Sequence, residues 1–168
     1  MQDTSLLRRC AAGAGLAVAT VLAGCATQAP VPQAAAPAEP QAPACQAAAA
    51  QDGIVGNWLS VRREKGVRGE LRTLFTLNAD GTMAYTEQLK RGKQPSQGLD
   101  ETGCWSRKDN GLVLRTLESN GAQVALDDPI YTNTYTVVSS SPEKLTLKAP
   151  DGAVLNARRM SPGYRLPF

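Results

Sequence analysis

Cysteine is the residue type whose chemistry this 168-residue sequence defines best. The chain has four cysteines, Cys10, Cys25, Cys45 and Cys104, and no histidine. Histidine is the commonest general base and metal ligand, so its absence removes the usual partner of both kinds of site. The thiols have no imidazole to complete a zinc site or to activate a nucleophile. We therefore expect no metal, no cofactor and no enzymatic activity. The cysteines become candidates for covalent attachment and cross-linking.

Three short strings match parts of catalytic or metal-binding motifs but lack the rest of them. Residues 141–144, SPEK, match the S-x-x-K string of penicillin-binding enzymes, yet they precede an expected strand instead of opening a helix. Residues 78–81, NADG, match part of a calcium loop without its closing glutamate. The carboxylate pairs Asp100-Glu101 and Asp127-Asp128 fall in expected loops. We predict that all of these residues lie in turns or on the surface.

The first 24 residues have the composition of an export signal. Arg8 and Arg9 precede an apolar run over residues 10–22, which is shorter than the roughly 20 residues that span a bilayer. Residues 22–25, LAGC, follow directly and resemble the bacterial lipobox at every position. The alternative is an ordinary secretory signal in which the cysteine occurs by chance.

The lipobox resemblance implies that the signal is cleaved before Cys25 and that fatty acids such as palmitate are attached to its thiol. Each buried methylene contributes about 0.8 kcal/mol, so several acyl chains anchor a protein durably. The next residue is Ala26 and not aspartate, which in bacterial lipoproteins favours sorting to the outer membrane. The resemblance therefore implies a lipid-anchored outer-membrane protein whose domain faces the periplasm.

Cleavage before an acylated Cys25 would leave Cys45 and Cys104 as the remaining thiols. An even number of cysteines in an exported protein favours a disulfide between them. Closing a loop of this length would stabilise the fold by about 4 kcal/mol in the chain-entropy model. Two alternatives stay open: free thiols with Cys104 in the core, or a bond between two copies through Cys45.

Composition divides the chain into three parts: a signal over 1–24, the lipidated cysteine with a linker over 25–52, and a domain over 53–168. The linker is almost entirely Ala, Pro and Gln, which buries too little surface to fold and favours an extended, disordered spacer. Without the signal, 16 basic and 14 acidic residues remain. This near balance gives no indication of a nucleic-acid partner.

The domain sequence predicts an all-β fold of eight short antiparallel strands. Turn residues recur between them, as in Asp109-Asn110-Gly111, where glycine supplies the positive φ of tight turns. Side chains alternate, so that Leu71, Thr73 and Phe75 share one face of a strand, and Tyr131 and Tyr135 one face of another. The strands are expected at residues 54–63, 70–78, 82–90, 102–108, 111–118, 130–139, 143–149 and 153–160. They can form a sandwich or an up-and-down barrel, and a barrel leaves no exposed edges.

Gly56-Asn57-Trp58 in the first strand and Arg158-Arg159 in the last resemble the lipocalin and calycin pattern. In that family the tryptophan of a G-x-W triplet closes one end of an eight-stranded barrel, and a basic residue packs across its ring. The resemblance implies that Trp58 and Arg159 form this pair. Gly103-Cys104-Trp105 repeats the triplet in the middle of the chain.

A lipocalin-like domain implies binding, either of a small apolar ligand or of an envelope protein. The aromatic residues either line a cavity or simply fill the barrel: Trp58, Phe75, Tyr85, Trp105, Tyr131 and Tyr135. The basic residues Arg62, Arg63, Lys65 and Arg68 fall in the first inter-strand loop, as a solvated hairpin end or a contact for an acidic partner.

Two further functions are open. The barrel also resembles bacterial metalloprotease inhibitors, whose N-terminal segment enters the protease cleft, so a periplasmic inhibitor of a protease or of lysozyme is the main alternative. A structural factor in envelope assembly is the other.

Overall fold

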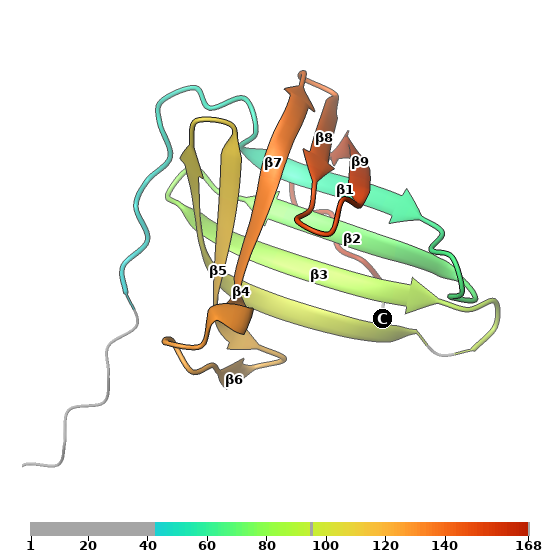
Figure 1. The fold of residues 1–168 in the computed structure, drawn as a ribbon. Helices are drawn as coiled ribbons and strands as arrows, with labels where there is room; N and C mark the ends of the chain where they lie inside the picture. The colour runs from blue at the N-terminus through green and yellow to red at the C-terminus, as the bar shows by residue number, and fades with distance from the viewer. Residues whose placement is uncertain (1–42, 95, 168) are drawn as a thin grey trace, which may run out of the picture. The chain divides into compact units, whose positions relative to one another are not determined.

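The computed structural model describes residues 43–94 and 96–167, and this part of the chain is built almost wholly from β-strands. One short 3₁₀ helix, η1, precedes the seventh strand (Figure 1). The strands are β1 (Gly56–Arg62), β2 (Glu70–Leu77), β3 (Thr82–Lys90), β4 (Gln97–Lys108), β5 (Gly111–Ser119), β6 (Ala122–Gln123), β7 (Thr132–Ser140), β8 (Lys144–Lys148) and β9 (Val154–Met160), and η1 spans Pro129–Tyr131. In these ranges there is no helix with the length and apolar character to cross a membrane.

The strands form a closed antiparallel barrel. Their order is β4-β3-β2-β1-β9-β8-β7-β5, and pairing between β4 and β5 closes the ring. The two-residue β6 lies outside the ring and pairs only with the end of β5. The predicted eight-stranded antiparallel barrel is therefore confirmed, with β6 as one additional strand.

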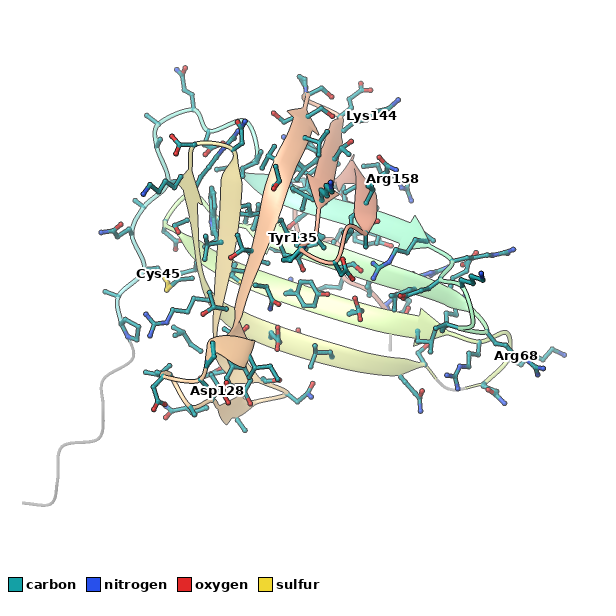
Figure 2. All side chains as sticks on the ribbon, in the orientation of Figure 1. Cys45, Arg68, Asp128, Tyr135, Lys144 and Arg158 are labelled. Carbon is teal, nitrogen blue, oxygen red and sulfur yellow. A yellow bond between two sulfur atoms is a disulfide. The ribbon has the colours of Figure 1, made fainter. Side chains whose placement is uncertain are left out.

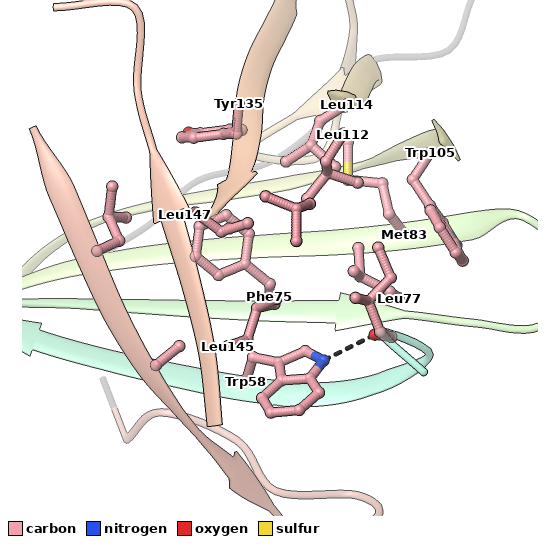
Figure 3. Packing of buried hydrophobic residues seen from close by; sticks show 14 residues of the cluster. Trp58, Phe75, Leu77, Met83, Trp105, Leu112, Leu114, Tyr135, Leu145 and Leu147 are labelled. Atoms are coloured by element: carbon pink, nitrogen blue, oxygen red, sulfur yellow. Dashed lines mark hydrogen bonds between the residues drawn. The ribbon is translucent and has the colours of Figure 1, made fainter. Parts of the chain in front are cut away.

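The barrel interior is filled by apolar side chains that alternate along the strands. Trp58, Phe75 and Tyr85 lie opposite one another in β1, β2 and β3 and point inward. Leu145 and Leu147 from β8 are fully buried against the same core. Figure 3 shows Trp58, Phe75, Leu145 and Leu147 packing together in the barrel. Since burying a large apolar side chain contributes roughly 1.5–3 kcal/mol, this core supplies most of the stabilisation.

A second, smaller apolar cluster lies on the outer surface of β1 and β2. Leu59 and Leu74 point outward but are buried, because the C-terminal segment covers them with Leu166. Asn57 Nδ2 donates a hydrogen bond to the Ser161 carbonyl, 2.9 Å away, at the start of this segment. Gln88 Nε2 donates to the Pro167 carbonyl at its end. The segment is thus fixed along the barrel wall.

Three local expectations were wrong. β4 begins at Gln97, so Asp100 and Glu101 lie in a strand and not in a loop; Asp100 faces solvent and Glu101 is buried. Arg62 is the last residue of β1 and not part of the following loop. Tyr131 belongs to η1, where the Asp128 side chain accepts a hydrogen bond from Ile130 N and Pro129 begins the turn.

Candidate functional site

Trp58 and Arg159 pack against each other near one end of the barrel. The guanidinium carbon of Arg159 lies 4.1 Å from the centroid of the Trp58 ring. The same guanidinium donates hydrogen bonds to the carbonyls of Val55 (2.7 Å) and Gly53 (2.9 Å), and also to that of Pro142. The indole nitrogen of Trp58 donates to the Ile54 carbonyl at 2.7 Å (Figure 3). A cation over an indole contributes about 0.5–2 kcal/mol, and here several hydrogen bonds add to it.

Gly56 is required next to this pair for two reasons. Its φ is +135°, a conformation that side-chain-bearing residues rarely adopt. A Cβ at this position would lie 2.3 Å from Nη1 of Arg159. The glycine of the G-x-W triplet therefore makes room for the arginine that stacks on the tryptophan.

The second G-x-W triplet serves the same end of the barrel. The Trp105 indole nitrogen donates to the Asn78 carbonyl at 2.8 Å, in the turn between β2 and β3. Cys104, the residue before it, forms a disulfide with Cys45, with an S–S distance of 2.01 Å and a Cα–Cα distance of 5.2 Å. Ala48 N donates to the Ala79 carbonyl at 2.9 Å. The segment before β1 is thus bound to the barrel from Cys45 onward.

The aromatic residues inside the barrel pack against one another. The Phe75 ring meets Tyr85 at 5.3 Å and Tyr135 at 5.7 Å between centroids, both edge to face. Trp105 is buried in the same core. These side chains occupy the space that an apolar ligand would need at the centre of the barrel. Tyr131 lies apart from them in η1.

Polar side chains inside the barrel form a connected network towards the end remote from Trp58. Tyr85 Oη donates to Glu87 Oε2 at 2.8 Å, and Arg62 Nη1 donates to Thr73 Oγ1 at 3.0 Å. Thr73 Oγ1 donates in turn to Glu87 Oε2 at 3.3 Å. Burial, with a contribution from the Glu87 carboxylate, raises the pKa of Tyr85 far above its ordinary value. The phenol stays protonated and acts as a donor to the carboxylate.

Glu101 is the second inward-facing carboxylate. It accepts a hydrogen bond from Thr116 Oγ1 at 3.2 Å. Burial raises the pKa of Glu101, and this hydrogen bond offsets part of that effect. Burial also raises the pKa of Tyr135. The polar groups inside the barrel are therefore hydrogen-bonded to one another.

A groove lies on the outer surface of the barrel. Its floor is a row of outward-facing residues that the strand register places side by side: Asn57, Thr76, Ala84 and Thr102 on β1 to β4. The groove has a volume of about 800 Å³. The floor is recessed relative to its surroundings because three of these four residues, Thr76, Ala84 and Thr102, have small side chains.

The walls of the groove come from the ends of two strands of the ring, β9 and β5, and from the chain segments that follow β9 and β6. On one side stand Met160 and Pro162 at the start of the C-terminal segment. On the other stand Leu117, Val124 and Leu126, from the end of β5 and the chain after β6. The walls are mainly apolar, with the charged side chains of Arg165 and Glu118 also lining the groove. Sequence reasoning missed this groove because the floor exists only once the register of four strands is known.

The remaining predicted sites are quickly placed. Cys25, the expected lipid attachment residue, lies outside the described residues. Within residues 43–94 and 96–167, no group of three His, Cys, Asp or Glu side chains is arranged to hold a metal ion. Comparisons with models of known protein families and with curated proteins give no match to this chain.

Proposed function

We propose that this protein is a lipid-anchored, non-enzymatic binding protein of the bacterial envelope, and that it takes a small, largely apolar ligand in the groove outside its barrel. The observation that supports this function most is the volume of the groove, about 800 Å³, because small-molecule sites are usually 300–1,000 Å³. The centre of the barrel is already filled by the residues that would line a ligand cavity there. The calycin-like barrel is in this view a scaffold for an external site.

The lining of the groove indicates the class of ligand. Val124, Leu126 and Met160 offer apolar contact, while Asn57 and Thr76 supply a few polar groups on the floor. Sites of this composition hold the body of a ligand by apolar burial and orient it through a small number of hydrogen bonds. An amphipathic molecule with an elongated apolar part fits this chemistry.

Thr102→Trp tests the groove directly. Thr102 is exposed on the floor, so an indole there fills the site without entering the core. We expect binding of the apolar probe N-phenyl-1-naphthylamine, measured by equilibrium dialysis, to weaken about tenfold or more, since lost burial of a few methylenes is worth that much. Thr134→Trp, at an exposed outward position on β7, is the matched control and should bind as the original chain does. Undiminished binding by the folded Thr102→Trp and Ala84→Trp variants would exclude the groove.

The anchor has its own test. The LAGC string places the acylated residue at position 25, so Cys25→Ser should abolish incorporation of labelled palmitate in bacterial cells and release the protein from the membrane fraction. Cys10→Ser removes a thiol from the signal instead and should leave the labelling intact. Labelling that persists in Cys25→Ser would contradict the anchor.

A further inference from the structure

Two loops far apart in the sequence meet at the end of the barrel opposite the disulfide. The loop between β1 and β2 ends at Gly69, where a Cβ would lie 2.5 Å from the Lys90 carbonyl and 3.1 Å from Arg91 Cγ. Glu70 and Lys90 are direct partners in the β2–β3 ladder. The loop between β3 and β4 therefore begins beside the loop between β1 and β2. Figure 2 shows Arg68 at one end of the long strands and Cys45 at the other.

This meeting of loops gathers positive charge. We call the cationic residues of the two loops, together with Lys90 at the end of β3, the basic rim; they are Arg63, Lys65, Arg68, Lys90, Arg91 and Lys93. Residues 63–70 and 90–93 together carry six basic and two acidic side chains, a net charge of +4. The whole chain after Gly24 has a net charge of only +2. The excess of positive charge over the mature chain is thus concentrated at one end of the barrel.

Most of the basic rim has no acidic partner. Glu70 forms ion pairs with Arg63 at 3.9 Å and with Arg72 at 3.3 Å, so it does not neutralise the other cations of the rim. Among the ion pairs of residues 43–94 and 96–167, none involves Lys65, Arg68 or the cations of the second loop. All six side chains of the rim are exposed. Gathering unpaired like charges raises the energy of the fold through repulsion, which an anionic surface would relieve.

Val67 adds an apolar contact at the centre of this charge. It lies between Lys65 and Arg68 at the tip of the loop and is 38 % exposed. An exposed aliphatic side chain among cations is the composition of segments that rest on a bilayer, where the apolar group enters the interface and the cations meet lipid phosphates. The rim has no aromatic residue to stack on nucleic-acid bases.

We propose that the basic rim binds the surface of a bilayer that contains anionic lipids. Each Lys or Arg near such a surface contributes about 1 kcal/mol. The 20 residue steps from Cys25 to Cys45 span at most about 70 Å, whereas β4, the longest strand, is about 40 Å long at roughly 3.3 Å per residue. The segment that links an anchor at Cys25 to the domain is therefore long enough for the rim to reach the membrane that holds the anchor. The rim and the groove are separate surfaces, so membrane binding by the rim can be tested independently of ligand binding in the groove.

The test uses a chain that begins at Ala26, which lacks the acylation site and keeps every strand of the barrel together with Cys45. Sedimentation with vesicles should show binding to an equal mixture of phosphatidylglycerol and phosphatidylcholine, and loss of that binding at high salt. Arg68→Glu/Arg91→Glu, with one reversal in each loop, should weaken binding about tenfold or more. Lys108→Glu/Lys144→Glu makes the same change in charge at exposed positions outside the rim and should bind as the original chain does.

Urea unfolding shows that each variant is folded before its binding is compared. Equal binding by the rim variant and the original chain, or equal binding to pure phosphatidylcholine, would overturn the proposal. Retention of the original chain on soluble polyglutamate without any binding to vesicles would assign the rim to acidic proteins and would overturn it as well.

Discussion

Trp58 and Arg159 are direct cross-strand partners in the ladder between β1 and β9, and the guanidinium lies over the indole at 4.1 Å. The pair joins the first and last strands of the barrel, which are neighbours in the ring. Since β1 and β9 pair only from Asn57 to Ser60, side-chain contacts at this seam add to the few main-chain hydrogen bonds that hold the two strands together.

Replacing Arg159 should weaken this seam. Arg159→Ala removes the cation from the indole and leaves carbonyls in the chain before β1 without their donor, so we expect the free energy of unfolding to fall by about 3 kcal/mol. Arg159→Lys keeps the positive charge but loses the several N–H donors of the guanidinium. It should therefore retain only part of the stability that Arg159→Ala loses. Urea unfolding measures both. Arg158→Ala, at the exposed neighbouring position, should stay within about 0.5 kcal/mol of the original; similar losses at both positions would contradict the assignment.

Gly56→Ala should destabilise the same end of the barrel by about 2 kcal/mol or more, because alanine disfavours a φ of +135° and its Cβ displaces the Arg159 guanidinium. The control is Gly53→Ala, where a Cβ meets nothing within 4 Å. Thermal unfolding distinguishes them. If the Gly56→Ala and Gly53→Ala variants have the same melting temperature, the contact with Arg159 does not constrain residue 56.

Removal of the disulfide should lower the free energy of unfolding by about 4 kcal/mol, the chain-entropy value for cysteines 59 residues apart. Cys45→Ser and Cys104→Ser should cost similar amounts, and the double variant little more than either alone, because one bond is lost in all three. Urea unfolding with and without reductant provides the comparison. Costs that add in the double variant would show that each cysteine acts on its own.

Glu101 gives the stability a defined dependence on pH. Burial raises the folded-state pKa of Glu101 above the value of about 4.3 for an unfolded glutamate. The stability due to this group is therefore complete below about pH 4.3 and is lost as the pH rises through the folded-state pKa. Glu101→Gln keeps an oxygen that accepts from Thr116 and removes the titration, so the variant should gain stability relative to the original across this window. If the unfolding free energies of Glu101→Gln and of the original chain change with pH in parallel, Glu101 does not contribute to the pH dependence.

Much of the fold could be predicted from the sequence, because its hairpins are marked by local turn chemistry. The NADG turn and the alternation in β2 and β3 specify a hairpin without tertiary information. The start of β4 could not be found in this way, because Gln97 and Gly98 have no apolar alternation and are held in a strand by the main chain of β3.

Tyr131 shows the opposite error. Its spacing from Tyr135 fits one face of a strand, but the preceding Asp128-Pro129 starts a 3₁₀ turn through the Asp128 side chain. An aspartate directly before a proline is a known turn signal, and the turn here delays the start of the strand to Thr132. The two surface features, the groove and the basic rim, depend on how the strands assemble and are not marked by local sequence patterns. The basic rim depends on the pairing of β2 with β3, and the groove depends on the pairing of β1 to β4 and on the segments beside them.

The bond between Cys45 and Cys104 also decides where a mechanical load enters the domain. A pull on the chain upstream of Cys45 passes through the sulfurs into β4, which is hydrogen-bonded along its length by β3 and, from Glu101 onward, by β5. Without the bond, the same pull would arrive at the start of β1 and peel it from its short seam with β9. The cross-link therefore diverts tension from a seam of four residue pairs to a strand that is paired on both sides.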